Sequence, residues 1–89
     1  MKLVDVKPSK RKDKKLVATF DDGRQIHFGS KTSQTFAEGA SNKKRENYIK
    51  RHKVREDWTR INPGSLSKYI LWSKPSIEEG VKEFIKKLN

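Results

Sequence analysis

The stretch from Ser41 to Trp58 constrains the fold most, because it predicts a helix with two different faces. At 3.6 residues per turn, one half of the helix carries Arg45, Tyr48, Ile49, His52 and Arg55, and the other half carries Lys43, Asn47, Lys50, Arg51 and Lys53. A helix with so little apolar surface is not stable by itself in water, so it must dock on a core formed elsewhere in the chain. The pattern predicts an anchored apolar side and a cationic side that faces solvent.

That core must be small, because 31% of the 89 residues are hydrophobic and 37% are charged. A chain of this length is expected to form one domain, residues 1–89. The net charge of +11 raises its affinity for anything densely negative. Nucleic acid is the partner that such a charge most often indicates, and an acidic protein surface is the alternative.

The chain contains no cysteine, which excludes disulfides and thiolate metal sites. A secreted domain this small usually relies on disulfides, so we expect an intracellular location, or one inside a particle, rather than secretion. No apolar run approaches the length of a membrane span, and the first ten residues lack the apolar segment of a signal peptide. We therefore expect no membrane insertion.

The first third of the sequence predicts a small antiparallel sheet. Leu3–Val6 is a short strand pattern that Pro8 stops, and Lys15–Gly29 contains two alternating runs on either side of Asp22-Gly23. The Asp-Gly pair predicts a hairpin with a two-residue type I′ turn, which would set Thr19 opposite Ile26 and Val17 opposite Phe28. With the first strand, the hairpin makes three strands.

The rest of the chain predicts about three helices. Gly29–Ala40 is a polar, turn-rich loop pinned by Phe36, and Ser41 or Asn42 is suited to cap the helix after it. Further starts are expected where Asn62 precedes Pro63 and where Ser76 precedes Glu79 by three positions. Two apolar sets follow these starts: Leu66, Tyr69, Ile70, Leu71 and Trp72 as a buried central helix, and Ile77, Val81, Phe84, Ile85 and Leu88 as a stripe on the last helix. The fold class is α+β, with an N-terminal three-stranded antiparallel sheet packed against C-terminal helices.

The sequence offers little for catalysis. His27 and His52 lie in different elements, where packing or hydrogen bonding is their expected role, and no cysteine is present to complete a metal site. The Asp21-Asp22 pair belongs to the hairpin turn, and Glu56 with Asp57 forms a charge pair at a helix end. No phosphate-binding glycine loop, nucleophile elbow or HExxH motif occurs. We expect no enzyme activity, no cofactor, no metal and no small-molecule substrate.

The basic residues are the candidate binding site. They form one group on the connection after the first strand and a second on the long helix, and we expect both to contact backbone phosphates. The candidate residues are Lys10, Arg11, Lys12, Lys14, Lys43, Lys44, Lys50, Arg51 and Lys53. The first group is either a solvated hairpin loop or a flexible finger that grips phosphates. Neither group is interleaved with exposed aromatic residues, so little base selectivity is expected.

Three segments of the chain resemble a family of short basic proteins encoded by large nucleocytoplasmic DNA viruses. The resemblance rests on an F-x-D-G-R hairpin ending in F-G (Phe20 to Gly29), a Y-I-x-R-H segment followed by E-x-W (Tyr48 to Trp58) and an L-S-x-x-I-L-W-x-K-P block (Leu66 to Pro75). It covers roughly residues 15–76, and the loop Lys31–Asn42 departs from the family pattern. The matching residues fall mostly on turn and core positions.

The resemblance implies a viral context but no established activity. Two functions fit it: a non-enzymatic module that binds nucleic acid through backbone phosphates, or a minor capsid protein whose basic face contacts acidic surfaces of neighbouring subunits. Either would act inside the host cell and in the virion. An accessory factor bound to an RNA polymerase or a ribosome is a weaker third alternative.

Overall fold

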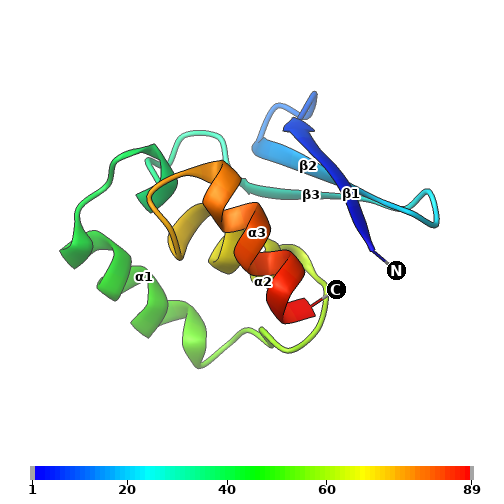
Figure 1. Ribbon diagram of the computed structural model, residues 1–89. Coiled ribbons are helices and arrows are strands. Elements are labelled where there is room, and N and C mark those ends of the chain that lie inside the picture. Colours follow the sequence, from blue (N-terminus) through cyan, green and yellow to red (C-terminus); the bar gives the residue numbers. More distant parts are fainter. Residues whose placement is uncertain (1, 89) are drawn as a thin grey trace.

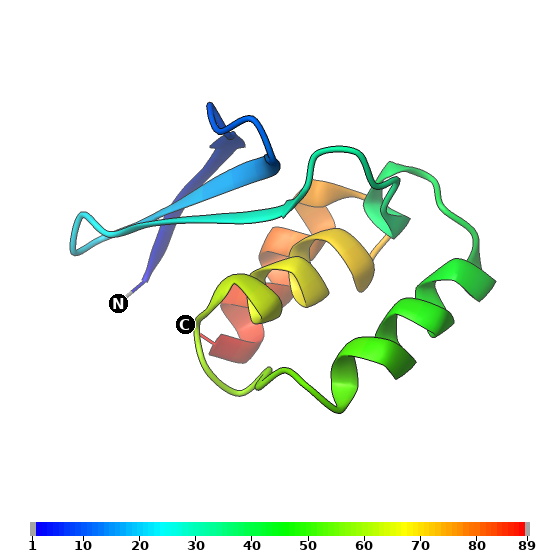
Figure 2. The same ribbon diagram turned by 180° about the vertical axis from the view of Figure 1, so that it is seen from behind.

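The computed structural model describes residues 2–88 and places a small sheet beside a group of helices (Figure 1). The sheet contains β1 (Leu3–Pro8), β2 (Lys14–Phe20) and β3 (Gln25–Ser30). After a 3-10 turn η1 (Phe36–Glu38) come α1 (Asn42–Lys53), α2 (Pro63–Leu66), the π-helical segment η2 (Ser67–Trp72) and α3 (Ile77–Leu88). The α+β class and the three-stranded antiparallel sheet, in the order β1-β2-β3, are confirmed. The views from both sides show α1 at the edge of the molecule, away from the sheet (Figure 2).

The hairpin between β2 and β3 has a longer turn than the Asp-Gly pair predicts. The Gly23 N–H donates to the Phe20 carbonyl at 3.0 Å, and the Phe20 N–H donates to the Arg24 carbonyl at 2.9 Å. Three residues therefore form the loop, with Gly23 in the left-handed region at a φ of 85°. This is the type I turn followed by a left-handed residue, a common three-residue hairpin loop. The predicted two-residue type I′ turn is wrong.

The extra loop residue shifts the register of the hairpin by one position. Leu16 pairs with Phe28 and Ala18 with Ile26, instead of the predicted pairs Val17–Phe28 and Thr19–Ile26. A shift of one residue moves every side chain of a strand to the other face of the sheet. Phe28 therefore joins Leu16 and Ala18 in the core, where all three are buried.

The first strand contains a bulge that the sequence pattern does not reveal. Leu3 pairs with Phe20 and Val6 pairs with Ala18, and the register shifts between Leu3 and Asp5. Val4 is the additional residue and is 65% exposed. Because side chains alternate along a strand, the bulge allows Leu3 and Val6 to lie on the same side of β1 although they are three positions apart.

The centre of the core is the Leu66–Trp72 segment, as predicted. Leu66, Ile70 and Leu71 are fully buried. The predicted start is also confirmed, because the Asn62 side chain accepts a hydrogen bond from the Ser65 N–H at 2.9 Å and Pro63 occupies the first position of α2. The π-helical winding of η2 is a feature that the pattern did not predict.

Helix α3 packs closely against η2. Its start is confirmed, because the Ser76 hydroxyl accepts the Glu79 N–H at 3.2 Å. A Cβ atom on Gly80 would lie 2.3 Å from the Ile70 carbonyl oxygen, so only glycine permits this contact. Phe84 is buried as expected. Ile85, which the stripe assigned to the core, is 41% exposed.

Helix α1 begins where predicted and ends earlier. The Ser41 hydroxyl accepts the Lys44 N–H at 3.2 Å, so Ser41 is the cap. The helix ends at Lys53, and the prediction that it continues to Trp58 is wrong. The His52 carbonyl accepts the N–H groups of both Arg55, at 3.1 Å, and Glu56, at 3.0 Å, which closes the last turn and redirects the chain.

Candidate anion-binding surface

Helix α1 is attached to the rest of the domain by a short column of stacked rings. The Tyr48 ring lies between the Trp72 ring, at 4.3 Å between centroids, and the His52 ring, at 4.1 Å. On the same side of α1, Arg45 donates from Nε to the Trp72 carbonyl at 2.8 Å. The predicted docking of this half of the helix is confirmed for these residues and for the half-buried Ile49. Arg55, which the pattern placed on the same half of the helix, lies beyond the end of α1 and is exposed.

The ring column continues into a polar chain after the helix. His52 Nδ1 and Glu56 Oε2 are 2.7 Å apart, and Trp58 Nε1 donates to Glu56 Oε1 at 3.0 Å. The expected hydrogen-bonding role of His52 is therefore confirmed. The expected helix-end charge pair of Glu56 and Asp57 is wrong for Glu56. One of its carboxylate oxygens is hydrogen-bonded to the His52 ring and the other accepts from the Trp58 ring. The spacing of Tyr48, His52 and Glu56 at intervals of four was the available signal for this arrangement.

The opposite side of α1 carries five exposed cations, which we call the α1 ridge. They are Lys43, Lys44, Lys50, Arg51 and Lys53. Among residues 2–88, no carboxylate lies within ion-pair distance of any of them. Glu46 is the one acidic residue within the helix sequence. The ridge is therefore a strip of net positive charge without ion pairs in the described part of the chain, and Glu46 lies one helical turn from Lys43 and Lys50.

The other predicted cations, Lys10, Arg11 and Lys12, lie on the connection between β1 and β2 and are exposed. That connection is an ordered turn. The buried Ser9 hydroxyl accepts the Arg11 N–H at 3.0 Å and lies 2.7 Å from His27 Nδ1, which confirms a hydrogen-bonding role for His27. Both views place this turn away from α1 (Figures 1 and 2). The structure thus separates these three cations from the α1 ridge.

A cleft of about 350 Å³ lies between α1 and the connection from β3 to η1, and we call it the α1 cleft. Lys44 and Arg51 line it from α1, and Lys14 lines it from the start of β2. Tyr48 and Trp72 also line it, with the polar residues of the connection on the other side. The structure therefore brings Lys14 together with two residues of the α1 ridge, across 30 positions of sequence. Sequence periodicity does not predict that Lys14 lies near the α1 ridge, because these residues belong to different elements.

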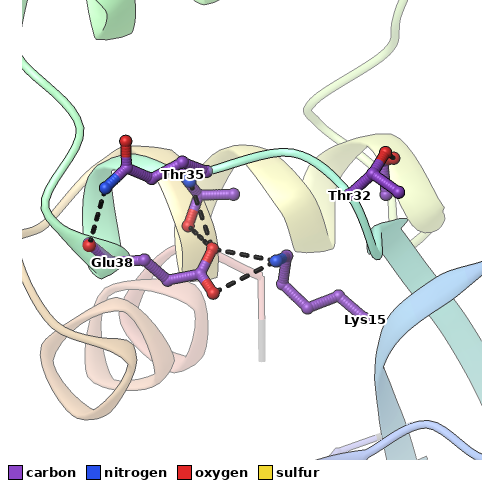
Figure 3. Close-up of polar contacts among 6 residues, drawn as sticks. Lys15, Thr32, Thr35 and Glu38 are labelled. Atoms are coloured by element: carbon purple, nitrogen blue, oxygen red, sulfur yellow. Dashed lines mark hydrogen bonds and ion pairs between the residues drawn. The ribbon is translucent and has the colours of Figure 1, made fainter.

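The wall formed by the β3–η1 connection is held in place by Glu38 (Figure 3). Glu38 Oε1 accepts hydrogen bonds from the Thr35 N–H at 3.1 Å and the Thr35 hydroxyl at 2.8 Å, and Lys15 Nζ lies 3.0 Å away. Partial burial raises the pKa of the Glu38 carboxyl, but the bonds from Lys15 and Thr35 outweigh it and hold that pKa below its ordinary value. Glu38 therefore neutralises Lys15 and leaves the neighbouring Lys14 without an ion pair.

Within the cleft, Tyr48 is a neutral hydroxyl. Burial, and secondarily the nearby Glu56 carboxylate, raise the pKa of Tyr48 well above its ordinary value. The Glu56 carboxylate itself is occupied by His52 and Trp58. Three unpaired cations beside a neutral hydroxyl are suited to hold an anion.

Residues 2–88 contain no group of three or more His, Cys, Asp or Glu side chains that could hold a metal ion. Within the same range, no helix has the length and apolarity needed to cross a membrane.

Comparison with known protein families identifies a relationship over the N-terminal part of the chain. The model of a family of unknown function, DUF5754, matches residues 4–52. The match is more than half of the chain, and it includes the sheet, the β3–η1 connection and α1 as far as His52. No curated protein and no solved structure matches the chain.

Proposed function

The chain belongs to the family of unknown function DUF5754, and we propose that it is a non-enzymatic basic module that binds nucleic acid through backbone phosphates. The observation that carries the proposal is the α1 ridge, whose five exposed cations have no carboxylate partner among residues 2–88. Ion pairs between exposed side chains usually add little to the stability of a fold. A row of exposed cations adds much to the affinity for a polyanion, because its binding releases the counterions of that polyanion.

The length of the ridge suits a nucleic acid strand. Lys43 and Lys53 are ten residues apart, which corresponds to about 15 Å of helix. A ridge of this length reaches more than one phosphate of a strand that follows it. Lys44, Lys50 and Arg51 also border a shallow depression with Asn47 on the outer side of α1.

The aromatic residues argue for contact with the backbone rather than with bases. Both faces of the Tyr48 ring are covered by stacking, and Trp72 is buried. The half-buried Trp58 and Tyr69 rings lie against the Lys68 ammonium group, at 5.2 Å and 4.2 Å. No aromatic face is thus left open on the ridge for a base to stack on, and we propose binding with little sequence selectivity.

The test is a binding titration over a range of salt concentrations, with mixed-sequence duplex and single-stranded DNA and RNA. Contact with four to six phosphates gives a slope of log K against log salt of about −4 to −5. Replacing Lys43 and Lys50 with Gln should weaken binding and reduce the slope by about 2 units. Replacing Lys86 and Lys87 with Gln on α3 is the matched control, because it removes the same charge from another exposed helix face.

Absence of binding at low salt would refute the proposal. Equal loss in both variants would refute the role of the ridge.

A second candidate function, that of a minor structural protein in a capsid, is favoured by a different observation. Val4 and Ile85 are exposed, and with Val6, Ile77 and Val81 they line a mostly apolar groove between β1 and α3. Exposed apolar patches of this kind often mark protein interfaces, and the ridge cations would then pair with carboxylates of neighbouring subunits.

This alternative extends the viral resemblance and places the protein in infected cells and in the virion. It predicts a constant copy number in purified particles, together with weak binding to nucleic acid. Mass spectrometry of particles tests it, and absence of the protein from them would exclude it.

A further inference from the structure

We infer that the α1 cleft binds the terminal phosphate monoester of a nucleic acid strand or of a free nucleotide. This inference rests on the proposed function and adds a site to it, because the ridge accounts for contact along a strand and the cleft accounts for its end. The cleft is the place where cations from α1 and from β2 line the same cavity.

The cations around the cleft fall into two groups. Arg45 and Lys15 already have partners within the protein. Arg45 donates to the backbone carbonyls of Trp72 and Ser73, and Lys15 forms an ion pair with Glu38. Lys14, Lys44 and Arg51 have no carboxylate within ion-pair distance among residues 2–88. All three line the cleft, and Lys14 is half-buried there. Cations that line one cavity and lack a carboxylate partner can act together on an arriving anion.

Neutral donors complete the site. The Tyr48 hydroxyl stays protonated and is hydrogen-bonded to the Ser67 side chain, which also lines the cleft, and Ser33 adds a hydroxyl from the β3–η1 connection. Glu56 also lines the cleft, but His52 and Trp58 hold its two oxygens, which reduces its repulsion of an anion. Charge-assisted hydrogen bonds to phosphate oxygens are about twice as strong as those between neutral groups.

Two properties of the cleft, the number of its cations and its volume, favour a terminal phosphate monoester over a backbone phosphodiester. A backbone diester carries one negative charge, whereas a phosphate monoester carries about 1.5 to 2 near neutral pH. Three cations therefore favour the monoester. A volume of about 350 Å³ is at the lower end of the range for ligand sites and suits one nucleotide rather than a duplex. Because the Tyr48 ring is covered on both faces, the cleft does not select among bases.

The first experiment compares strand ends. Single-stranded 12-mers of one sequence, with a 5′-phosphate, a 3′-phosphate or only hydroxyl ends, are titrated against the whole protein. We expect at least one phosphorylated form to bind about tenfold more tightly than the hydroxyl form, as one strong charge-assisted contact would give. AMP and inorganic phosphate should shift the indole N–H resonance of Trp72, which lines the cleft, and adenosine should not.

Two single substitutions with the same charge change locate the effect. Lys14→Gln should abolish the preference for phosphorylated ends, and Lys86→Gln on the exposed face of α3 should retain it. If Lys14→Gln does not fold, the comparison of strand ends with the unaltered protein still decides. Equal affinity for all three 12-mers, with the salt dependence of the ridge intact, would overturn the cleft inference and leave the proposed function standing. Binding of AMP and phosphate without binding of any 12-mer would refute the proposed function and leave the cleft as a phosphate site.

Discussion

Gly80→Ala tests the packing of α3 on η2 in a way that separates two opposing effects. Gly80 lies inside α3, where alanine is the better helix former by about 1 kcal/mol. Helix propensity alone therefore predicts that the substitution stabilises the protein. The tertiary contact predicts the opposite, because the new methyl group would lie 2.3 Å from the Ile70 oxygen and 2.7 Å from the Ile70 carbonyl carbon.

The clash is with backbone, so no side-chain rotation relieves it. Helix α3 must move away from η2 by about 1 Å, and overpacking of this kind costs typically 1–3 kcal/mol and occasionally more. Ile70 is fully buried and cannot yield easily, so the upper end of that range applies. Subtracting the gain in helix propensity leaves a net loss of about 2 kcal/mol. For a domain of this size, that loss lowers Tm by roughly 10 °C.

Thermal and urea unfolding followed by circular dichroism measure this difference. Lys82→Ala on the same helix is the control, since the Lys82 side chain is 75% exposed and its loss should change stability by less than about 0.5 kcal/mol. A Gly80→Ala protein with an unchanged or higher Tm would refute the close approach of the two helices.

Two further substitutions test the parts that position the site. Glu38→Gln should lower the free energy of unfolding at pH 7 by about 1 kcal/mol, after allowance for the partial exposure of the pair. Because the pKa of Glu38 is lowered in the folded state, its contribution is present above the ordinary carboxyl range and is lost as the pH falls through the folded pKa. Urea unfolding at successively lower pH should therefore show the difference in stability between the two proteins shrinking. Tyr48→Leu removes the ring between Trp72 and His52, so the amides of α1 should exchange with solvent at least tenfold faster while those of β2 change less. Equal acceleration in both elements would show that α1 does not open independently.

The starts of the helices could be predicted from the sequence because they depend on neighbouring residues. A Ser or Asn side chain that caps a helix bonds to an N–H three positions later, so Ser41, Asn62 and Ser76 were recognisable without knowledge of the tertiary fold. The end of α1 has no such marker, because neither glycine nor proline follows Lys53 before Pro63. The helix pattern therefore appeared to continue to Trp58.

The Asp-Gly pair by itself predicts the wrong register, although the three-residue loop gathers Leu16, Ala18, Ile26 and Phe28 on one face and leaves Val17 as the apolar side chain of the other. An Asp-Asp-Gly sequence is compatible with a two-residue or a three-residue loop. The choice depends on which face the helices cover, and burial of Phe28 requires the three-residue loop. Gly80 did carry an unused signal, since glycine inside a helix costs stability and often marks a close backbone contact.

The α1 cleft depends on topology in a similar way. Lys14 and Lys44 meet at one cavity because the β3–η1 connection, held by Glu38, forms the wall opposite α1. No local pattern specifies that meeting.

The attachment of α1 explains why its outer side is available for binding. A helix of this composition contributes little apolar area, so its docking relies on the Tyr48 stack and the Arg45 hydrogen bonds, both on one side. Repulsion between Lys14 and the ridge residues Lys44 and Arg51 across the cleft opposes docking, since no carboxylate among residues 2–88 pairs with them. Any polyanion that neutralises the ridge removes this repulsion, so its binding and the docking of α1 reinforce each other. Lys44 and Arg51 belong to both the α1 ridge and the α1 cleft. An anion bound at the ridge or in the cleft would therefore strengthen the docking of α1 on the rest of the domain.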